Sequence, residues 1–230
     1  MRRRGRTRST STISAQIRNT CHWANLYVRG QAADYDGWAQ RGNLGWSYDD
    51  VLPYFRKAEN CEQLSDGDDS FDSALRGVGG PLNVAAVRTR YQALDMVIDA
   101  AEKLGYPRNH DYNGATQEGF GYYQVTQKNG LRFSAKKAYL QPARKRPNLR
   151  IITHAHVTKI SLTGKRADRV HYNRHGKSHY LRAGREVILS AGAIQSPQIL
   201  ELSGIGAPDH LRRHGIEVRH ELSGVGSHLT

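Results

Sequence analysis

The residues best suited to chemistry lie in the run Ser190-Ala-Gly-Ala-Ile-Gln-Ser-Pro197. Its first four residues are all small, and small residues let a ligand approach the backbone closely. A helix that begins just after them would present free N–H groups and the positive end of its dipole. This combination predicts a pyrophosphate site at the carboxyl end of a strand. The same residues also suit a tight strand–helix turn that needs small side chains only for packing.

Other glycines and histidines give weaker signals. Four Gly-x-Gly pairs lack the third glycine of the G-x-G-x-x-G dinucleotide fingerprint, and they lie at 77–79, 119–121, 204–206 and 224–226. Two histidine pairs could suggest a metal site. His171 and His175 lie across a predicted strand and turn and so do not share a helical face, whereas His210 and His214 could share one. No cysteine or carboxylate completes a zinc set at motif spacing, so we expect no metal site. A serine hydrolase is disfavoured because no G-x-S-x-G run is present.

The elements around the run decide what it can reach. Residues 186–190 form a compact apolar stretch, which predicts a strand buried on both faces of a parallel sheet. A helix should follow with Ser196 as N-cap and Pro197 at its first position, and it should stop at Gly204. Before this, alternating runs predict an antiparallel meander with turns at 163–165 and 175–177, and the strands are expected at 149–153, 157–162, 169–172 and 178–182. Tyr172 and Tyr180 fit packing on such a sheet better than base stacking.

The first half of the chain reads as helices and loops. Ser47 is the expected N-cap of a helix through about Glu59, and Pro53 should disturb this helix locally. Residues 91–104 have apolar side chains at a helical period, and Gly105 is the natural stop. A short helix should run from Ser134 through Leu140 and end at Pro142. Residues 62–80 read as a surface loop and 109–121 as an ordered loop.

Composition narrows the class of protein. The 230 residues include 34 Lys and Arg against 21 Asp and Glu, a formal net charge of +13. We interpret this mainly as diffuse, solvated charge, so a nucleic-acid partner is unlikely overall. Residues 1–24 are an exception, because five arginines crowd the first eight positions. We expect a disordered basic arm there; a nucleic-acid arm, a transit-like leader and an upstream start site are the alternatives.

Two cysteines are too few for a disulfide scaffold, which indicates a reducing, cytoplasmic setting. No run of about 18 apolar residues is present, so no membrane span is expected.

A longer pattern adds a family resemblance. Residues 192–206, Gly-Ala-Ile-Gln-Ser-Pro-Gln-Ile-Leu-Glu-Leu-Ser-Gly-Ile-Gly, closely resemble the second signature of glucose–methanol–choline (GMC) oxidoreductases. The runs 26–36 and 45–55 look like the choline dehydrogenase-like branch, and agreement continues at 79–82, 121–127, 134–140 and 224–226. The resemblance covers about residue 24 to residue 226.

This resemblance implies a flavoprotein that removes hydride from the carbon of a small-molecule alcohol. It implies an α/β fold with α+β elements: a partial FAD-binding, Rossmann-like domain with an antiparallel-sheet portion of the substrate domain. Val157 matches a valine whose backbone meets the adenine side of FAD, and Ser190, Ala191 and Gly192 match the strand end near the dinucleotide. Asn25 lies two positions after Trp23, which stands where the family has a flavin-contacting asparagine.

The departures from the family pattern are also informative. The opening G-x-G-x-x-G strand and the catalytic histidine region have no counterpart in this sequence, so no histidine is assigned as the catalytic base. We expect residues 25–226 to be an incomplete FAD-binding domain, with 227–230 a truncated tail, that is inactive alone and binds little or no FAD. The alternatives are a nucleic-acid-binding protein that uses the arginine-rich start and a non-enzymatic interaction module that keeps the substrate-domain sheet.

Overall fold

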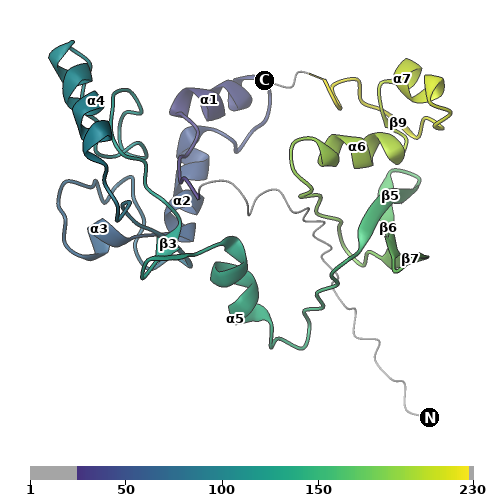
Figure 1. Ribbon diagram of the computed structural model, residues 1–230. Coiled ribbons are helices and arrows are strands. Elements are labelled where there is room, and N and C mark those ends of the chain that lie inside the picture. Colours follow the sequence, from purple (N-terminus) through teal and green to yellow (C-terminus); the bar gives the residue numbers. More distant parts are fainter. Residues whose placement is uncertain (1–24, 228–230) are drawn as a thin grey trace. The chain divides into compact units, whose positions relative to one another are not determined.

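The computed structural model describes residues 25–227, which form two compact units. We call residues 25–145 the helical unit and residues 146–227 the sheet unit, and each is described by itself (Figure 1). The predicted arm at 1–24 and residues 228–230 of the predicted tail lie outside the described residues. The expected mixture of helices and sheets is confirmed. None of the described helices is long and apolar enough to cross a membrane.

The helical unit combines helices with short strand pairs. Its helices are α1 (Ala32–Gln40), α2 (Tyr48–Ala58), α3 (Glu62–Ser65), α4 (Gln92–Lys103), the π-helix η2 (Lys136–Leu140) and α5 (Gln141–Ala143). Strand β1 (Glu59–Cys61) pairs in parallel with β2 (Leu82–Val84). Strands β3 (Gln127–Lys128) and β4 (Leu131–Arg132) form an antiparallel pair.

Local capping explains where α2 begins. The Ser47 hydroxyl accepts a hydrogen bond from the Asp50 N–H, and the Asp50 carboxylate accepts one from the Ser47 N–H. This reciprocal pair satisfies two backbone donors at the helix start, so the predicted N-cap is confirmed. The helix continues through Pro53 to Ala58.

Other helix predictions need correction. Helix α4 ends at Lys103 and Gly105 has a φ of +89°, as expected, but only Ile98 and Ala101 of the helix are buried. The predicted end at Pro142 is wrong, because η2 continues directly into α5, which contains that proline near its start.

The predicted surface loop at 62–80 is also only partly correct. It contains helix α3, and the side chains of Phe71 and Arg76 are buried rather than exposed. The loop at 109–121 is ordered as expected, with Asn109 and Asn113 buried and hydrogen-bonded.

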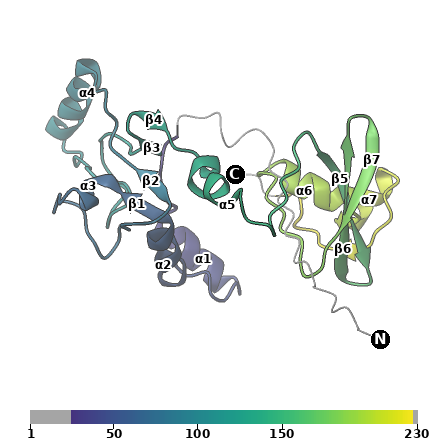
Figure 2. The ribbon, with the colours of Figure 1, turned by 90° about the horizontal axis from the view of Figure 1, so that it is seen from below.

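The sheet unit is built on an antiparallel meander. Strands β5 (His156–Thr163), β6 (Arg166–Arg174) and β7 (Lys177–Arg182) lie side by side in that order (Figure 2). His175 and Gly176 both have positive φ values, of 49° and 72°, in the two-residue loop between β6 and β7. That conformation matches the twist of a hairpin, so the turn prediction is confirmed.

Helices and a second strand pair complete this unit. Helix α6 (Gln195–Leu202) packs against β5, and Ile199 of α6 joins Ile160 and Val170 of the sheet in a buried cluster. Strand β8 (Ile205–Gly206) pairs in parallel with β9 (His220–Glu221), and helix α7 (Pro208–Arg213) lies between them in sequence.

Two predicted strands are wrong. Residues 149–153 are not in a strand. Residues 186–190 are not buried on both faces: Val187 and Leu189 pack against the core cluster, whereas Ile188 is 43% exposed. Ile188 forms only an isolated β-bridge, and no strand among residues 25–227 pairs with this run. An apolar run becomes a central strand only when neighbours pair with it on both edges.

The helical unit contains a buried cluster of charges. Glu59 of β1 accepts hydrogen bonds from the guanidinium groups of both Arg29 and Arg76, and all three side chains are at most 2% exposed. Arg76 also pairs with Asp111. Burial by itself lowers the pKa of Arg76, but the hydrogen bond and charge of Glu59, followed by the charge of Asp111, outweigh burial and raise that pKa. Arg76 therefore stays charged, and the guanidinium groups of Arg29 and Arg76 share the Glu59 carboxylate as their partner.

Replacing Glu59 with glutamine should destabilise the helical unit strongly. Glu59→Gln leaves two buried guanidinium groups without their shared counter-charge, and a broken buried pair costs about 3–5 kcal/mol. Urea unfolding of the whole chain followed by circular dichroism would measure this loss. The matched control is Glu118→Gln, an exposed position that should change the unfolding free energy by less than about 0.5 kcal/mol. Equal effects of the two substitutions would contradict the role given to the cluster.

Candidate functional site

The candidate site is the turn that precedes α6 in the sheet unit. Its conformation is fixed by two hydrogen bonds: the Ala191 N–H donates to the Ser196 hydroxyl at 3.0 Å, and the Ser196 N–H donates to the Gly192 carbonyl at 3.0 Å. The helix begins at Gln195 after Ile194, so the predicted N-cap at Ser196 is wrong. The Ser196 hydroxyl holds the turn instead of capping the helix.

The outer side of the turn is open. Gly192 has a φ of +92°, and no atom lies within 4 Å of the position that a Cβ would occupy there. The backbone N–H groups of residues 193–195 have no acceptor among the described residues. Free N–H groups at the positive end of a helix attract anions, and the absence of a side chain at Gly192 permits close approach. The turn can therefore receive a phosphate-bearing ligand.

The inner side of the turn is packed. Ala191 is 7% exposed and joins Ile160, Val170 and Ile199 in the core cluster, against which Val157 of β5 also packs. The structure thus brings together two residues that the sequence predicted for the site, Val157 and Ala191. Ser190, which precedes Ala191, is exposed.

A single hydroxyl ties α6 to the sheet. The Ile160 N–H of β5 donates to the Ser203 Oγ at 2.8 Å, and that hydroxyl donates to the Ile199 carbonyl at 2.5 Å. Sequence reasoning missed Ser203, because a serine one residue before a glycine stop looks like an ordinary helix end. Its contact fixes α6, and with it the N–H groups of the turn, against β5.

Asn25 belongs to the helical unit, whereas Val157 and residues 190–192 belong to the sheet unit. Its φ is +55°, and its carbonyl accepts a hydrogen bond from the Thr126 N–H at 2.7 Å. No hydrogen bond engages its side-chain amide among the described residues. The nearby backbone is held by Asn113, whose side chain accepts from the Arg29 N–H at 2.8 Å and donates to the Tyr27 carbonyl at 3.0 Å.

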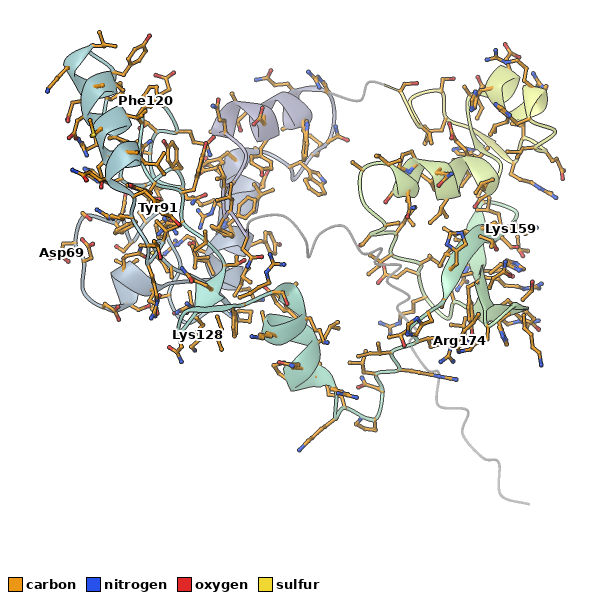
Figure 3. The ribbon with its side chains drawn as sticks, viewed as in Figure 1. Asp69, Tyr91, Phe120, Lys128, Lys159 and Arg174 are labelled. Atoms are coloured by element: carbon orange, nitrogen blue, oxygen red, sulfur yellow. The ribbon has the colours of Figure 1, made fainter. Side chains whose placement is uncertain are left out.

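The histidines hold other positions. His171 Nε2 lies 2.7 Å from Ser161 Oγ on the meander, which also carries Lys159 (Figure 3). Burial, followed by the charges of Lys159 and Arg169, lowers the pKa of His171 below its usual 6.5. His210 and His214 do lie together, with ring centroids 4.8 Å apart. Within residues 25–227, no group of three or more potential metal ligands gathers.

Comparison with known proteins gives concordant matches. The model of the family described as GMC oxidoreductase matches residues 23–230. Human mitochondrial choline dehydrogenase is 44% identical over 206 residues, which are 90% of this chain and 34% of that protein. An FAD-dependent oxidoreductase from Chaetomium thermophilum has a TM-score of 0.78 and 31% identity, and the match covers 87% of this chain and 36% of that one.

Pyridoxine 4-oxidase from Mesorbium loti has a TM-score of 0.76 and 29% identity over 86% of this chain and 38% of that one. The chain therefore spans about a third of the length of the relatives that it matches.

Removing the Ser196 hydroxyl should loosen the turn. Ser196→Ala leaves the Ala191 N–H, which is part of a buried residue, without its acceptor, and we expect a loss of about 1 kcal/mol and faster hydrogen exchange at that amide. Hydrogen exchange resolved by residue would measure both. Ser178→Ala removes an exposed hydroxyl in the same unit and serves as the control. Unchanged exchange at Ala191 in Ser196→Ala would contradict the assigned role.

Proposed function

We propose, since the chain belongs to the GMC oxidoreductase family, that it is part of the FAD-binding domain of an oxidoreductase that acts on the CH–OH group of an alcohol. The observation that carries this proposal is the turn at 190–192, where an open glycine and free helix N–H groups lie directly after a packed alanine. The family signature at 192–206 begins at that glycine.

The residues present fit FAD at its phosphate-bearing part. A pyrophosphate needs hydrogen-bond donors and room beside the backbone, and the turn provides both through the N–H groups of 193–195 and through Gly192. The extended start of β5 at Val157 would contribute backbone to the adenine side of FAD. Ser190 and Ala191 would fix the strand end. FAD, when bound, supplies the acceptor for the hydride of the alcohol.

The residues of this chain would bind and orient the cofactor rather than move the substrate proton. None of its histidines matches the catalytic base of the family, and His171 is engaged by Ser161 on the meander. We therefore propose that residues 1–230 alone do not oxidise alcohols. The resemblance to choline dehydrogenases points to choline or a related small alcohol as the substrate of the complete site.

Gly192→Ala should weaken FAD binding, because a Cβ at this position would fill the space that the pyrophosphate needs. We expect the unaltered chain to bind FAD weakly. The affinity of the variant for FAD should be at least about tenfold lower, because the added methyl group would displace the charged pyrophosphate from the N–H groups of the turn. Saturation-transfer NMR with added FAD would measure both affinities. Gly164→Ala is a close control, because Gly164 also has a positive φ and open space around it but lies in the β5–β6 turn.

Two outcomes would contradict the proposal. Equal FAD affinities of the Gly192 and Gly164 variants would remove the turn from the FAD site. A stoichiometric yellow complex that is bleached by choline would instead show that residues 1–230 contain a working base.

A further inference from the structure

The antiparallel meander of the sheet unit gathers much of the positive charge of the chain. Residues 156–182 contain seven lysines and arginines against the single carboxylate Asp168, a net charge of +6. The helical unit contains 15 residues of each sign between residues 25 and 145, so its net charge is zero. Within the described residues the positive charge is therefore concentrated, and a surface with such a charge attracts anionic partners.

Folding of the meander does not by itself account for where these charges lie. Arg174 stands directly opposite Lys177 where β6 turns into β7, and Arg169 stands opposite Arg182 further along the same two strands. Like charges directly opposite each other on neighbouring strands destabilise a sheet. Asp168 lies 3.2 Å from the Arg169 Nε, but Arg174 and Lys177 form no ion pair with any described residue. An anion beside these two cations would relieve their repulsion.

Strand β7 forms an open edge of the meander. The sheet order is β5, β6, β7, and no other described strand pairs with β7. The Ala183 N–H donates to the Asp168 carbonyl at 2.8 Å, and hydrogen-bonded pairs recur at every second residue of an antiparallel ladder. Ser178 and Tyr180 are therefore positions that direct their backbone N–H and C=O groups away from β6. A further extended chain could form hydrogen bonds with these groups.

The other edge of the meander is already covered. At that edge, the N–H of Ile160 in β5 donates to the hydroxyl of Ser203 at the end of α6, at 2.8 Å. Helix α6 also covers the face of the sheet that carries Ile160 and Val170. Strand β7 differs, because five of its six residues are exposed, among them Tyr180 with 56% of its surface. Of the two edges, only the β7 edge is available for pairing within the described residues.

The charge of the β7 edge decides which strand can pair with it. Open sheet edges invite pairing with other chains, and charged side chains such as Lys177 protect against this. A second copy of β7 would bring the same cations to the edge and would be repelled. An extended segment rich in carboxylates would meet opposite charges instead. The edge therefore disfavours pairing with its own copy and favours an acidic strand.

A peptide fits this edge better than a nucleic acid does. Sheets that bind nucleic acids offer exposed aromatic rings on which the bases stack. Here the Arg169 guanidinium lies 5.8 Å from the centroid of the Tyr180 ring, and Tyr172 stacks on His179 with centroids 5.3 Å apart. These rings already have partners. The outward N–H and C=O groups of β7, in contrast, have the spacing of the groups in an extended polypeptide.

We propose that the β7 edge binds an extended acidic peptide segment, which adds to the meander as a fourth strand. The backbone groups of Ser178 and Tyr180 bond to the peptide backbone, and Arg174 and Lys177 attract its carboxylates. The site lies entirely in the sheet unit, involves no covalent step and does not depend on bound FAD. It gives the meander a role in recognising an acidic protein segment.

A hexapeptide of alternating glutamate and threonine with blocked ends is the probe, and the full chain is the protein to use. NMR titration should show saturable binding that weakens as salt is added. Hydrogen exchange should slow at the Ser178 and Tyr180 amides and stay unchanged at His179, which already bonds to β6. The same peptide with methylated backbone nitrogens keeps its carboxylates but donates no backbone hydrogen bond. Its affinity should be at least about fivefold lower, the effect of two lost hydrogen bonds at the lower limit of their strength.

Two sets of variants separate backbone pairing from charge. Ser178→Pro removes the outward N–H and Ser178→Ala keeps it, while both lose the same hydrogen bond from the hydroxyl to Asn173. Proline is tolerated on an open edge, so Ser178→Pro should fold and should bind the peptide roughly 2- to 12-fold more weakly than Ser178→Ala. Arg174→Gln combined with Lys177→Gln should weaken binding roughly 2- to 30-fold, the range for two exposed ion pairs. Lys57→Gln, at an exposed position of the helical unit, should leave binding unchanged.

Three outcomes would overturn the proposal. The first is the absence of saturable peptide binding. The second is equal binding of the methylated peptide, or of Ser178→Pro and Ser178→Ala, which would identify a surface that recognises charge without strand pairing. The third is tighter binding of a thymidine oligonucleotide of equal charge than of the peptide, which would identify a nucleic-acid surface instead.

Discussion

The helical unit depends on one buried carboxylate. Glu59 lies at the start of a three-residue strand and pairs with arginines 30 residues before it and 17 residues after it. Strand β1 is too short to hold the unit by backbone pairing alone. The charges of Arg29 and Arg76 cannot be left without a partner once they are desolvated, so the segments that carry them must converge on Glu59. The need to pair these buried charges selects one arrangement of the chain, even if three apolar side chains in their place would be as stable.

The same constraint extends from the cluster to the backbone near the start of the described residues. Arg76 pairs with Asp111, whose carboxylate accepts from the Asn113 N–H, and Asn113 holds the backbone at Tyr27 and Arg29. Each step is a hydrogen bond with a buried or half-buried partner, so a displacement at Glu59 would be transmitted to the backbone that precedes Arg29. Asn25, four residues before Arg29, is held separately, since its carbonyl accepts from the Thr126 N–H.

The sequence predicted those structural features that are determined by residues close together in the chain, and it missed those that depend on distant residues. The cap at Ser47 and the hairpin turn at His175 and Gly176 were predictable, because each is determined by residues within one turn of chain. The strand expected at 186–190 was wrong, because its existence depends on paired neighbours that composition does not reveal. The charge cluster was missed because Glu59 and Arg76 look like surface residues in a polar stretch. Only their convergence from distant positions buries them.

The small residues allowed two interpretations, a pyrophosphate site and a turn that is tight only for packing. Each interpretation applies to a different residue of the turn. Ala191 is buried against Ile199 and Val170, so its size serves packing, and a larger side chain there would push α6 away from the sheet. At Gly192 the space that a Cβ would enter is empty to a distance of 4 Å, so packing cannot explain why this residue lacks a side chain. Its positive φ explains part of the preference for glycine, since other residues are strained there. Gly164 shares the positive φ and the open space, so it is the free N–H groups of residues 193–195 beside Gly192, and not the space alone, that carry the functional argument.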